Sequence, residues 1–191
     1  MRGLPVLSVS LAVVLIVASS APAAAELRIS TSPQWVYLND MDVTVQFTVL
    51  GAIPPTFTES IKSGIPSHVR FTVELWQYRR MWPDKLLLSK TIERQLVYNV
   101  LTKEFKVASL SGETREPYAS RELRDAQRVL SDLRGLKLLA ASQLEPSELF
   151  YVRVRAETAL SGNNTFLTRL SGEAEETPWT LSSLMTASRT Q

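Results

Sequence analysis

The chain has 191 residues, of which 45% are hydrophobic and 21% are charged, and its formal net charge at pH 7 is only +2. So small a basic surplus lacks the concentrated positive charge with which nucleic-acid-binding proteins neutralise phosphates, and we therefore expect no nucleic acid among its partners. The sequence contains no cysteine, which excludes disulfides and a lipid-modified cysteine, so the fold must depend on a hydrophobic core.

The N-terminus has the features of a cleavable signal peptide. Met1-Arg2 supplies a short positive start, Leu4 to Ala18 is an almost unbroken apolar run, and Ala21 to Ala25 offers small residues in the Ala-x-Ala pattern. The apolar run is shorter than the roughly 18 residues of a spanning helix, and no later stretch could span a membrane. We predict cleavage after Ala25, a mature chain that starts at Glu26, and a periplasmic or secreted location. An uncleaved anchor is the alternative.

The first part of the mature chain is typical of strands. Residues 26–40 are expected to form a broken edge strand, which Pro33 interrupts. The segment Met41 to Leu50 alternates almost perfectly between apolar and polar residues, and its β-branched content agrees with a half-buried strand. The residues expected on its buried face are Met41, Val43, Val45, Phe47 and Val49.

Two helices are predicted between the strands. Thr56 followed by Glu59 matches a capping box, so we expect a short helix from Thr56 to Ser63 that crosses from one sheet to the other. The second helix is expected to begin at Ser120 as its N-cap and to end at Gly135. Its apolar face comprises Leu123, Ala126, Leu130 and Leu133.

The remaining elements complete a predominantly β fold. The expected extended segments are Ser67 to Trp82, Lys85 to Val107, Phe150 to Leu160 and, after a turn at Ser161 to Asn164, Thr165 to Leu170. A short helix is expected from Thr177 to Leu184. Because strands dominate without regular βαβ alternation, we predict a mainly β, two-layer antiparallel β-sandwich, immunoglobulin-like in outline, with two inserted α-helices. Residues 26–187 form one domain in this interpretation, and residues 188–191 form a frayed tail.

The segment from Ser67 to Val107 is expected to contain a β-hairpin with Pro83 and Asp84 at its turn. The hydrophobic pattern selects one register, because a slip by one residue would scatter the apolar pairs over both faces. Pro-Asp is not a favoured two-residue turn, so a wider loop with the same parity is the alternative. The expected pairs are Leu75 with Ile92, Phe71 with Leu96, and Val69 with Tyr98.

The second face of this hairpin carries aromatic and basic side chains. In one interpretation another layer covers the rings and arginines lie over their edges; in the other the rings are exposed and bind a partner. Trp, Tyr and Arg are the residue types enriched at interface hot spots. The candidate interaction surface comprises Trp76, Tyr78, Arg80, Trp82 and Asp84.

Basic residues also alternate with apolar ones along several expected strands. This pattern indicates a solvated sheet face whose charges discourage edge pairing or, alternatively, a weakly basic surface that faces anionic lipid headgroups or an acidic partner. The residues are Arg79, Arg80, Arg94, Lys103, Lys106, Arg153 and Arg155.

We find no catalytic, cofactor-binding or metal-binding signature. His68 is the only histidine, and without cysteines it has no further nitrogen or sulfur ligands with which to build a zinc site. A G-x-S-x-G elbow, a phosphate loop and a dinucleotide fingerprint are absent. In the predicted hairpin register Glu74 lies opposite Glu93, and a carboxylate pair of this kind could form the catalytic site of a glycosidase. A solvated or arginine-paired surface is the simpler interpretation of these carboxylates.

The ordered set of segments ESIKSGIPSHVRFTVEL, RRMWPDK, LVYNVLTKEFKV, LFYVRVRAETAL and PWTLSSLM resembles the exported bacterial family catalogued as domain of unknown function 4390. The resemblance covers nearly the whole mature chain. One departure follows Leu160, where family members often have Leu-Pro and this chain has Ser161-Gly-Asn-Asn. The resemblance implies export and a bacterial origin but no chemistry. The matching residues are Ser63 to Pro66, Trp82, Asp84, Tyr98, Leu101, Thr102, Tyr151, Arg153, Arg155 and Trp179.

These observations together predict an exported envelope protein that acts as a non-enzymatic binding module. Its expected partner is another envelope protein or a membrane component, and we expect no cofactor and no metal. Two alternatives remain open: an envelope hydrolase that uses Glu74 or Asp84, and a carrier that holds a small hydrophobic ligand in a cavity between the sheets.

Overall fold

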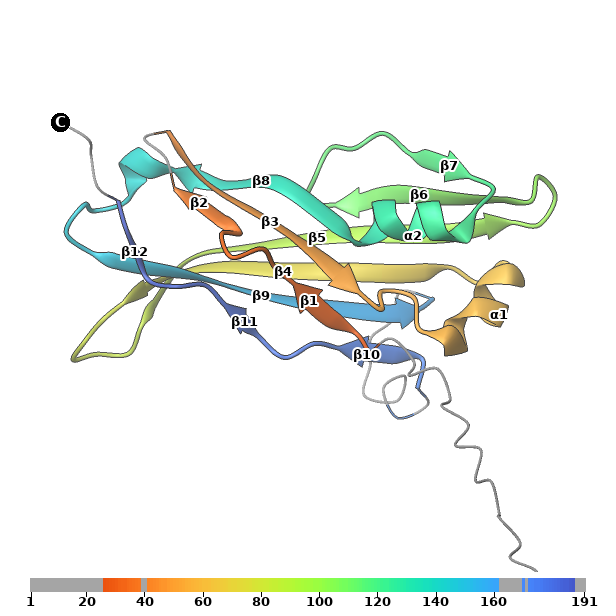
Figure 1. Ribbon diagram of the computed structural model, residues 1–191, viewed down its shortest axis with the longest axis horizontal. Helices are drawn as coiled ribbons and strands as arrows, with labels where there is room; N and C mark the ends of the chain where they lie inside the picture. Colours follow the sequence, from red (N-terminus) through yellow and green to blue (C-terminus); the bar gives the residue numbers. More distant parts are fainter. Residues whose placement is uncertain (1–25, 39–40, 162–169, 171, 188–191) are drawn as a thin grey trace, which may run out of the picture.

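The computed structural model describes residues 26–38, 41–161, 170 and 172–187, which form two antiparallel sheets packed face to face (Figure 1). In the smaller sheet the central strand β3 (Asp42–Leu50) pairs on one side with β1 (Arg28–Ser30) and β2 (Val36–Leu38), and on the other with β8 (Asp132–Ala140). This arrangement confirms a mainly β, antiparallel, two-layer sandwich.

The larger sheet is built on the long strands β9 (Leu149–Leu160), β4 (Ser67–Tyr78) and β5 (Lys85–Asn99), which lie side by side in that order. Beyond β5 follow β6 (Glu104–Ser111) and β7 (Tyr118–Ser120), while three short strands pair in turn with the outer edge of β9: β10 (Ala174–Glu176), β11 (Thr180–Leu181) and β12 (Met185–Thr186). The helical segments are η1 (Pro55–Phe57), α1 (Thr58–Lys62), α2 (Leu123–Ser131) and η2 (Ala141–Gln143).

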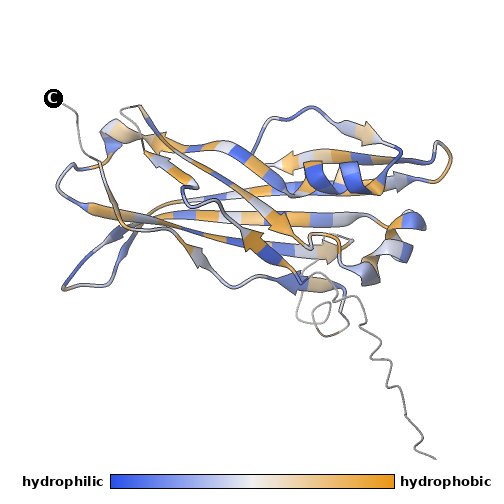
Figure 2. Ribbon diagram, viewed as in Figure 1, coloured by the Kyte–Doolittle hydropathy of each residue, from blue (hydrophilic) through white to orange (hydrophobic). Residues whose placement is uncertain are grey.

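Alternating side chains explain why the long strands form a sandwich. In β3 every second residue is buried, and the predicted buried face is confirmed except for Met41, which precedes the strand and is 74% exposed. The same alternation runs along β4 and along β9 as far as Ala156, and it is visible as alternating colours along the strands in Figure 2. Each strand therefore places one apolar row between the sheets and one polar row outside.

The centre of the core is aromatic. Phe47 from the smaller sheet meets Phe71 from the larger sheet edge-to-face, with ring centroids 5.8 Å apart, and Trp35 lies edge-on to Phe47 at 6.4 Å. All three side chains are buried. Burial of this apolar area, with favourable ring geometry, is the main contribution that holds the two sheets together.

The predicted hairpin register is wrong by four residues, although its parity is confirmed. Phe71 lies opposite Ile92 and Leu75 opposite Leu88, so the same apolar row faces the core. A period of two fixes which face a residue occupies, but it does not fix how far the strands slide past one another by an even number of residues. The wider loop from Arg79 to Asp84 replaces the expected two-residue turn. Correspondingly, Glu74 does not face Glu93.

The helices are present, but their predicted ends are wrong. The Thr56–Glu59 capping box does not form, because the segment begins with η1 and no side chain caps either N-terminus. The second helix begins at Leu123, with Glu122 and not Ser120 at its N-cap, and it ends at Ser131, four residues before Gly135, where the chain continues as β8. In β8 a bulge near Gly135, whose φ is +61°, separates the apolar residues by three positions, which imitates helical spacing.

The segment between β5 and β6 and the C-terminal segment also differ from prediction. A turn between Asn99 and Glu104 divides the single extended segment expected from Lys85 to Val107. The helix expected from Thr177 to Leu184 is wrong: the hydroxyl groups of Thr177 and Ser182 accept hydrogen bonds from backbone N–H groups of β9, which keeps this segment extended. Apart from Leu170, the predicted returning strand at Thr165 to Leu170 and the end of the turn before it lie outside the described residues.

Candidate functional site

The five residues of the candidate interaction surface divide into two groups in space. Trp76 is half-buried on the outer face of β4, whereas Tyr78, Arg80 and Trp82 are exposed at the end of the hairpin, with Trp82 75% exposed. Asp84 is half-buried at the base of the same loop. The two groups have different partners.

Trp76 belongs to a layered cluster on the outer face of the larger sheet. The guanidinium carbon of Arg153 lies 4.3 Å from the ring of Trp76 and 4.3 Å from the ring of Trp179, so the cation is held between two indoles. One carboxylate oxygen of Glu74 accepts hydrogen bonds from Trp76 Nε1 at 2.8 Å and from Arg153 Nε at 2.6 Å. These cation–π contacts and the shared acceptor hold together the aromatic–arginine cluster of Glu74, Trp76, Arg153 and Trp179.

Strand pairing explains how the cluster assembles. In the antiparallel pair of β4 and β9, Glu74 lies directly opposite Arg153 and Trp76 opposite Tyr151. Trp179 arrives from the segment between β10 and β11, which runs along the outer edge of β9. No sequence pattern predicted that Arg153 or Trp179 would lie beside Trp76. The alternation that carries Arg153 on the polar side of β9 was a usable signal, but nothing in the sequence indicated where Trp179 would lie.

Ion pairs continue along the same outer face. Arg155 contacts Glu157 and Glu176, and Arg70 lies 3.6 Å from Glu157 and 3.5 Å from Glu93. Of the basic residues expected to form a ladder, Arg153 and Arg155 are therefore paired with carboxylates on this face. Pairing neutralises much of the positive charge on this face, although each pair contributes little to stability.

The base of the hairpin loop is held by Asp84. One of its carboxylate oxygens accepts a hydrogen bond from the backbone N–H of Arg79 at 2.9 Å, and the other accepts one from the hydroxyl of Tyr151 at 2.9 Å. Burial, followed by the hydrogen bond to Asp84, raises the pKa of Tyr151 above its ordinary value. We call the residues from Arg79 to Asp84 the hairpin tip.

Asp84 thus closes the loop from both sides, while the apex of the hairpin tip stays in solvent. Met81 is 85% exposed and Trp82 is 75% exposed. Burial of large apolar side chains is favourable, so the exposure of Met81 and Trp82 on a loop with a fixed base calls for a functional explanation.

The carboxylates considered for catalysis are occupied by structural contacts. Glu74 accepts bonds within the aromatic–arginine cluster, and Asp84 accepts bonds that close the hairpin loop. These contacts give the hydrolase interpretation no support. Within the part of the chain that the structure describes, no group of three or more His, Cys, Asp or Glu side chains is placed to hold a metal ion.

A surface hollow of about 480 Å³ lies beside β1, β3 and β8. A carrier of hydrophobic ligands needs an apolar cavity between the sheets. This hollow does not have that character, because most of its lining residues are polar: Ser30, Thr31, Ser32, Gln46, Thr48, Asp132 and Arg134, with Phe47 and Leu133.

His68 lies on the outer face beside Glu93, and its protonation gives a first testable prediction. Burial lowers its pKa below 6.5, Glu93 partly opposes this effect, and Arg70 adds to it. A depressed histidine pKa means that the unfolded chain binds the proton more readily, so stability is complete above about pH 6.5 and falls as the pH drops towards the folded pKa. We expect urea unfolding between about pH 8 and 5 to show this loss of stability. Because a single group titrates, the free energy of unfolding should change by less than the limit for one proton, which is about 1.36 kcal/mol per pH unit.

The replacement His68→Gln removes the titrating group and keeps a polar side chain of similar reach. We expect the variant to lose much less stability between pH 7 and 5 than the wild-type protein does. Parallel curves for the two proteins would assign the pH dependence to other groups.

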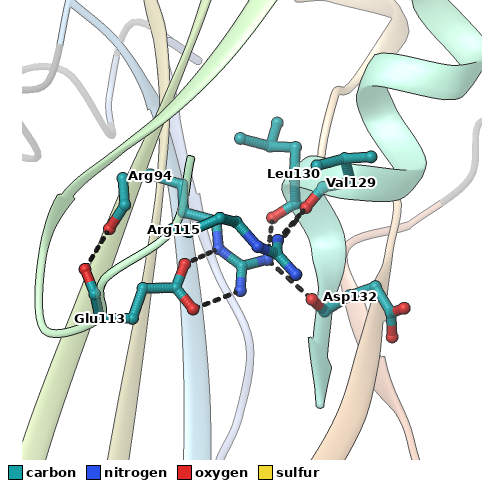
Figure 3. Close-up of polar contacts among 7 residues, drawn as sticks. Arg94, Glu113, Arg115, Val129, Leu130 and Asp132 are labelled. Atoms are coloured by element: carbon teal, nitrogen blue, oxygen red, sulfur yellow. Dashed lines mark hydrogen bonds and ion pairs between the residues drawn. The ribbon is translucent and has the colours of Figure 1, made fainter. Parts of the chain in front are cut away.

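Arg94 has a structural role that the sequence pattern did not predict. Arg94 is completely buried, and its guanidinium binds both carboxylate oxygens of Glu113, at 2.5 and 3.0 Å (Figure 3). It also donates to backbone carbonyls where α2 ends and β8 begins: those of Val129, Leu130 and Asp132. Expected in the exposed basic ladder, Arg94 instead joins β5 to the α2–β8 junction from inside.

Comparisons with known proteins place the chain in a family. No curated protein and no solved structure matches it. No helix among the described residues is long and apolar enough to cross a membrane. A family model described as Domain of unknown function (DUF4390) matches residues 26–163, which include β1 to β9 and both halves of the hairpin. The chain therefore belongs to the family described as Domain of unknown function (DUF4390).

Proposed function

We propose that this protein is an exported envelope protein that acts as a binding module, not as an enzyme, and that the hairpin tip contacts its partner. The observation that carries the proposal is the exposure of Met81 and Trp82 at the apex of a loop whose base Asp84 fixes on both sides. A preformed loop loses little conformational freedom when it binds, so its exposed side chains contribute more of their contact energy to affinity.

The residue types of the hairpin end also support binding. Trp, Tyr and Arg dominate interface hot spots because they bury a large area and retain a polar group. At this end of the larger sheet Tyr78, Arg80 and Trp82 are all exposed, and Leu149, which lies opposite Tyr78, is 36% exposed. The partner is another envelope protein or a component of the membrane.

Export is supported by the leader and by where the domain starts. The positive start, apolar run and Ala-x-Ala pattern are those of a signal peptide. Leu27 is buried and β1 begins at Arg28, so the residues that directly follow the predicted cleavage site already belong to the folded domain. The absence of cysteine agrees with a domain that holds together through its apolar core alone.

Site-specific photo-crosslinking in cells tests the proposal. A photoreactive residue at position 82 reports what the hairpin tip touches, and the same residue at Leu110, which is 50% exposed on β6, is the matched control. We expect a discrete adduct from position 82 that is absent from position 110. Mass analysis of the purified protein also reads its N-terminus, which we expect to be Glu26.

Two results would overturn parts of this proposal. No adduct of any kind from position 82, or identical adducts from positions 82 and 110, would remove the hairpin tip as the binding surface. A protein that retains Met1 and stays in the cytoplasmic fraction would contradict export.

A further inference from the structure

We infer that the hairpin tip docks on a bilayer surface that contains anionic lipids, with Met81 and Trp82 entering the headgroup region; this inference rests on the proposed function. The tip has an apolar apex and a basic surround. Arg79 and Arg80 precede the two apex residues and Lys85 follows the tip, and all three basic side chains are exposed. An indole at the headgroup level flanked by basic side chains is the arrangement that membrane interfaces favour.

The charges of the hairpin tip are less balanced than its sequence suggests. Its one carboxylate, Asp84, is half-buried and accepts two hydrogen bonds at the base of the loop. Among the described residues, Arg79, Arg80 and Lys85 form no ion pair, and all three basic groups are exposed. The sheet face above them is different, because carboxylates there pair with Arg70, Arg153 and Arg155. Positive charge is thus concentrated at the tip and not along the strands.

The shape of this end also favours a bilayer over a protein groove. The β4–β5 hairpin extends beyond the neighbouring strands and forms a projecting point at one end of the sandwich (Figure 1). A projecting apex presents its side chains to a soft, extended surface without needing a complementary pocket. Interfaces between proteins, in contrast, bury a broad patch with a packed centre.

Acidic residues near the tip set the depth of docking. The loop that precedes β9 carries Glu145, which is exposed, and Glu148, which is half-buried. Because Leu149 lies opposite Tyr78, Glu148 is close to the start of the hairpin tip. Anionic headgroups would repel these carboxylates, so the apex enters the interface while the body of the sheet stays in water.

Vesicle flotation with the processed protein tests the inference. The vesicles contain either phosphatidylcholine alone or phosphatidylcholine mixed with phosphatidylglycerol, at low ionic strength, where screening is weak. We expect binding to the anionic vesicles and much weaker binding to the neutral ones. Each basic residue near an anionic surface contributes a similar amount to the binding free energy. Arg79→Gln with Arg80→Gln should therefore lower the partition coefficient roughly 30-fold. Trp82→Ala should lower it about tenfold through loss of the apolar contact.

A charge-matched control separates docking at the tip from general attraction. Arg121→Gln with Arg124→Gln removes the same charge from exposed positions at the start of α2. We expect this variant to bind like the wild-type protein. Equal losses in the two double variants, or no binding to anionic vesicles by the wild-type protein, would overturn the inference. Circular dichroism melts verify that each variant is folded.

The two experiments separate the inference from the function on which it rests. A protein adduct from position 82 together with no vesicle binding refutes lipid docking and leaves the binding module in place. A lipid adduct from position 82 together with tip-dependent flotation supports both. No adduct from position 82 removes the proposed function itself.

Discussion

Replacing Arg94 with methionine is expected to destabilise the protein by about 3–5 kcal/mol, because the change breaks a buried ion pair from one side. Methionine fills a similar length of the core but donates no hydrogen bonds. Glu113 would lose its partner, and three backbone carbonyls at the end of α2 would lose a donor inside the protein. Unsatisfied buried acceptors carry a desolvation penalty, and a cation at the C-terminal end of a helix also stabilises the helix dipole. In a domain of this size the loss should lower Tm by roughly 6–20 °C.

Arg115→Ala is the matched control for Arg94→Met. Both arginines donate to the carbonyl oxygen of Val129, but Arg115 is exposed and, within the described part of the chain, forms that hydrogen bond alone. We expect Arg115→Ala to cost no more than about 1 kcal/mol. Urea unfolding of the two variants checks the difference. Similar losses would mean that the shared carbonyl, and not the buried pair with Glu113, accounts for the effect.

Arg94 shows where sequence reasoning stops. Its position between Ile92 and Leu96 places it on the inner face by parity, and all three residues are completely buried. An arginine there is tolerable only with a partner, and that partner, Glu113, lies in an irregular loop after β6 whose position no periodic pattern predicts. Strand periodicity therefore predicts which face a residue occupies, but not which loop returns to satisfy it.

This limit of strand periodicity also explains which strands were predicted wrongly. Alternation was sufficient to predict β3, β4 and β9, which are long and buried on one face. It failed for β8, because the bulge near Gly135 changes the spacing of its apolar residues from two to three. It failed for the C-terminal strands because β11 and β12 have two residues each, too few to show a period.

The candidate site was predicted in part for the same reason. Parity placed Trp76 and Tyr78 on the outer face, and the exposure of Tyr78 and Trp82 agrees with an accessible surface. The sequence did not reveal that Trp76 is stacked on Arg153, or that Asp84 is a structural acceptor. The stacking of Trp76 and the hydrogen bond from Tyr151 to Asp84 both depend on β9, which is more than sixty residues away in sequence. Contacts between distant strands decide which aromatic residues remain available to a partner.

Gly112→Ala is expected to destabilise the protein by about 3–5 kcal/mol, which combines backbone strain with overpacking. Gly112 has a φ of +83°, a conformation that an alanine adopts only with strain. A Cβ atom there would lie 2.1 Å from the carbonyl oxygen of Thr91 and 2.8 Å from the Cα of Ile92, and neither backbone atom can move without moving β5. The chain would have to lift away from β5 at the residue that precedes Glu113, so the contact with Arg94 should weaken as well.

The variant Gly135→Ala separates the contribution of backbone strain from that of overpacking. Gly135 also has a positive φ, +61°, but a Cβ atom at this position would meet nothing within 4 Å. It should therefore cost only the backbone strain, about 1–2 kcal/mol. Thermal and urea unfolding of both variants measure the difference. Equal losses would show that the close approach of Gly112 to β5 is not a constraint on the fold. A larger loss for Gly112→Ala would identify this contact as the one that lets the loop after β6 reach Arg94.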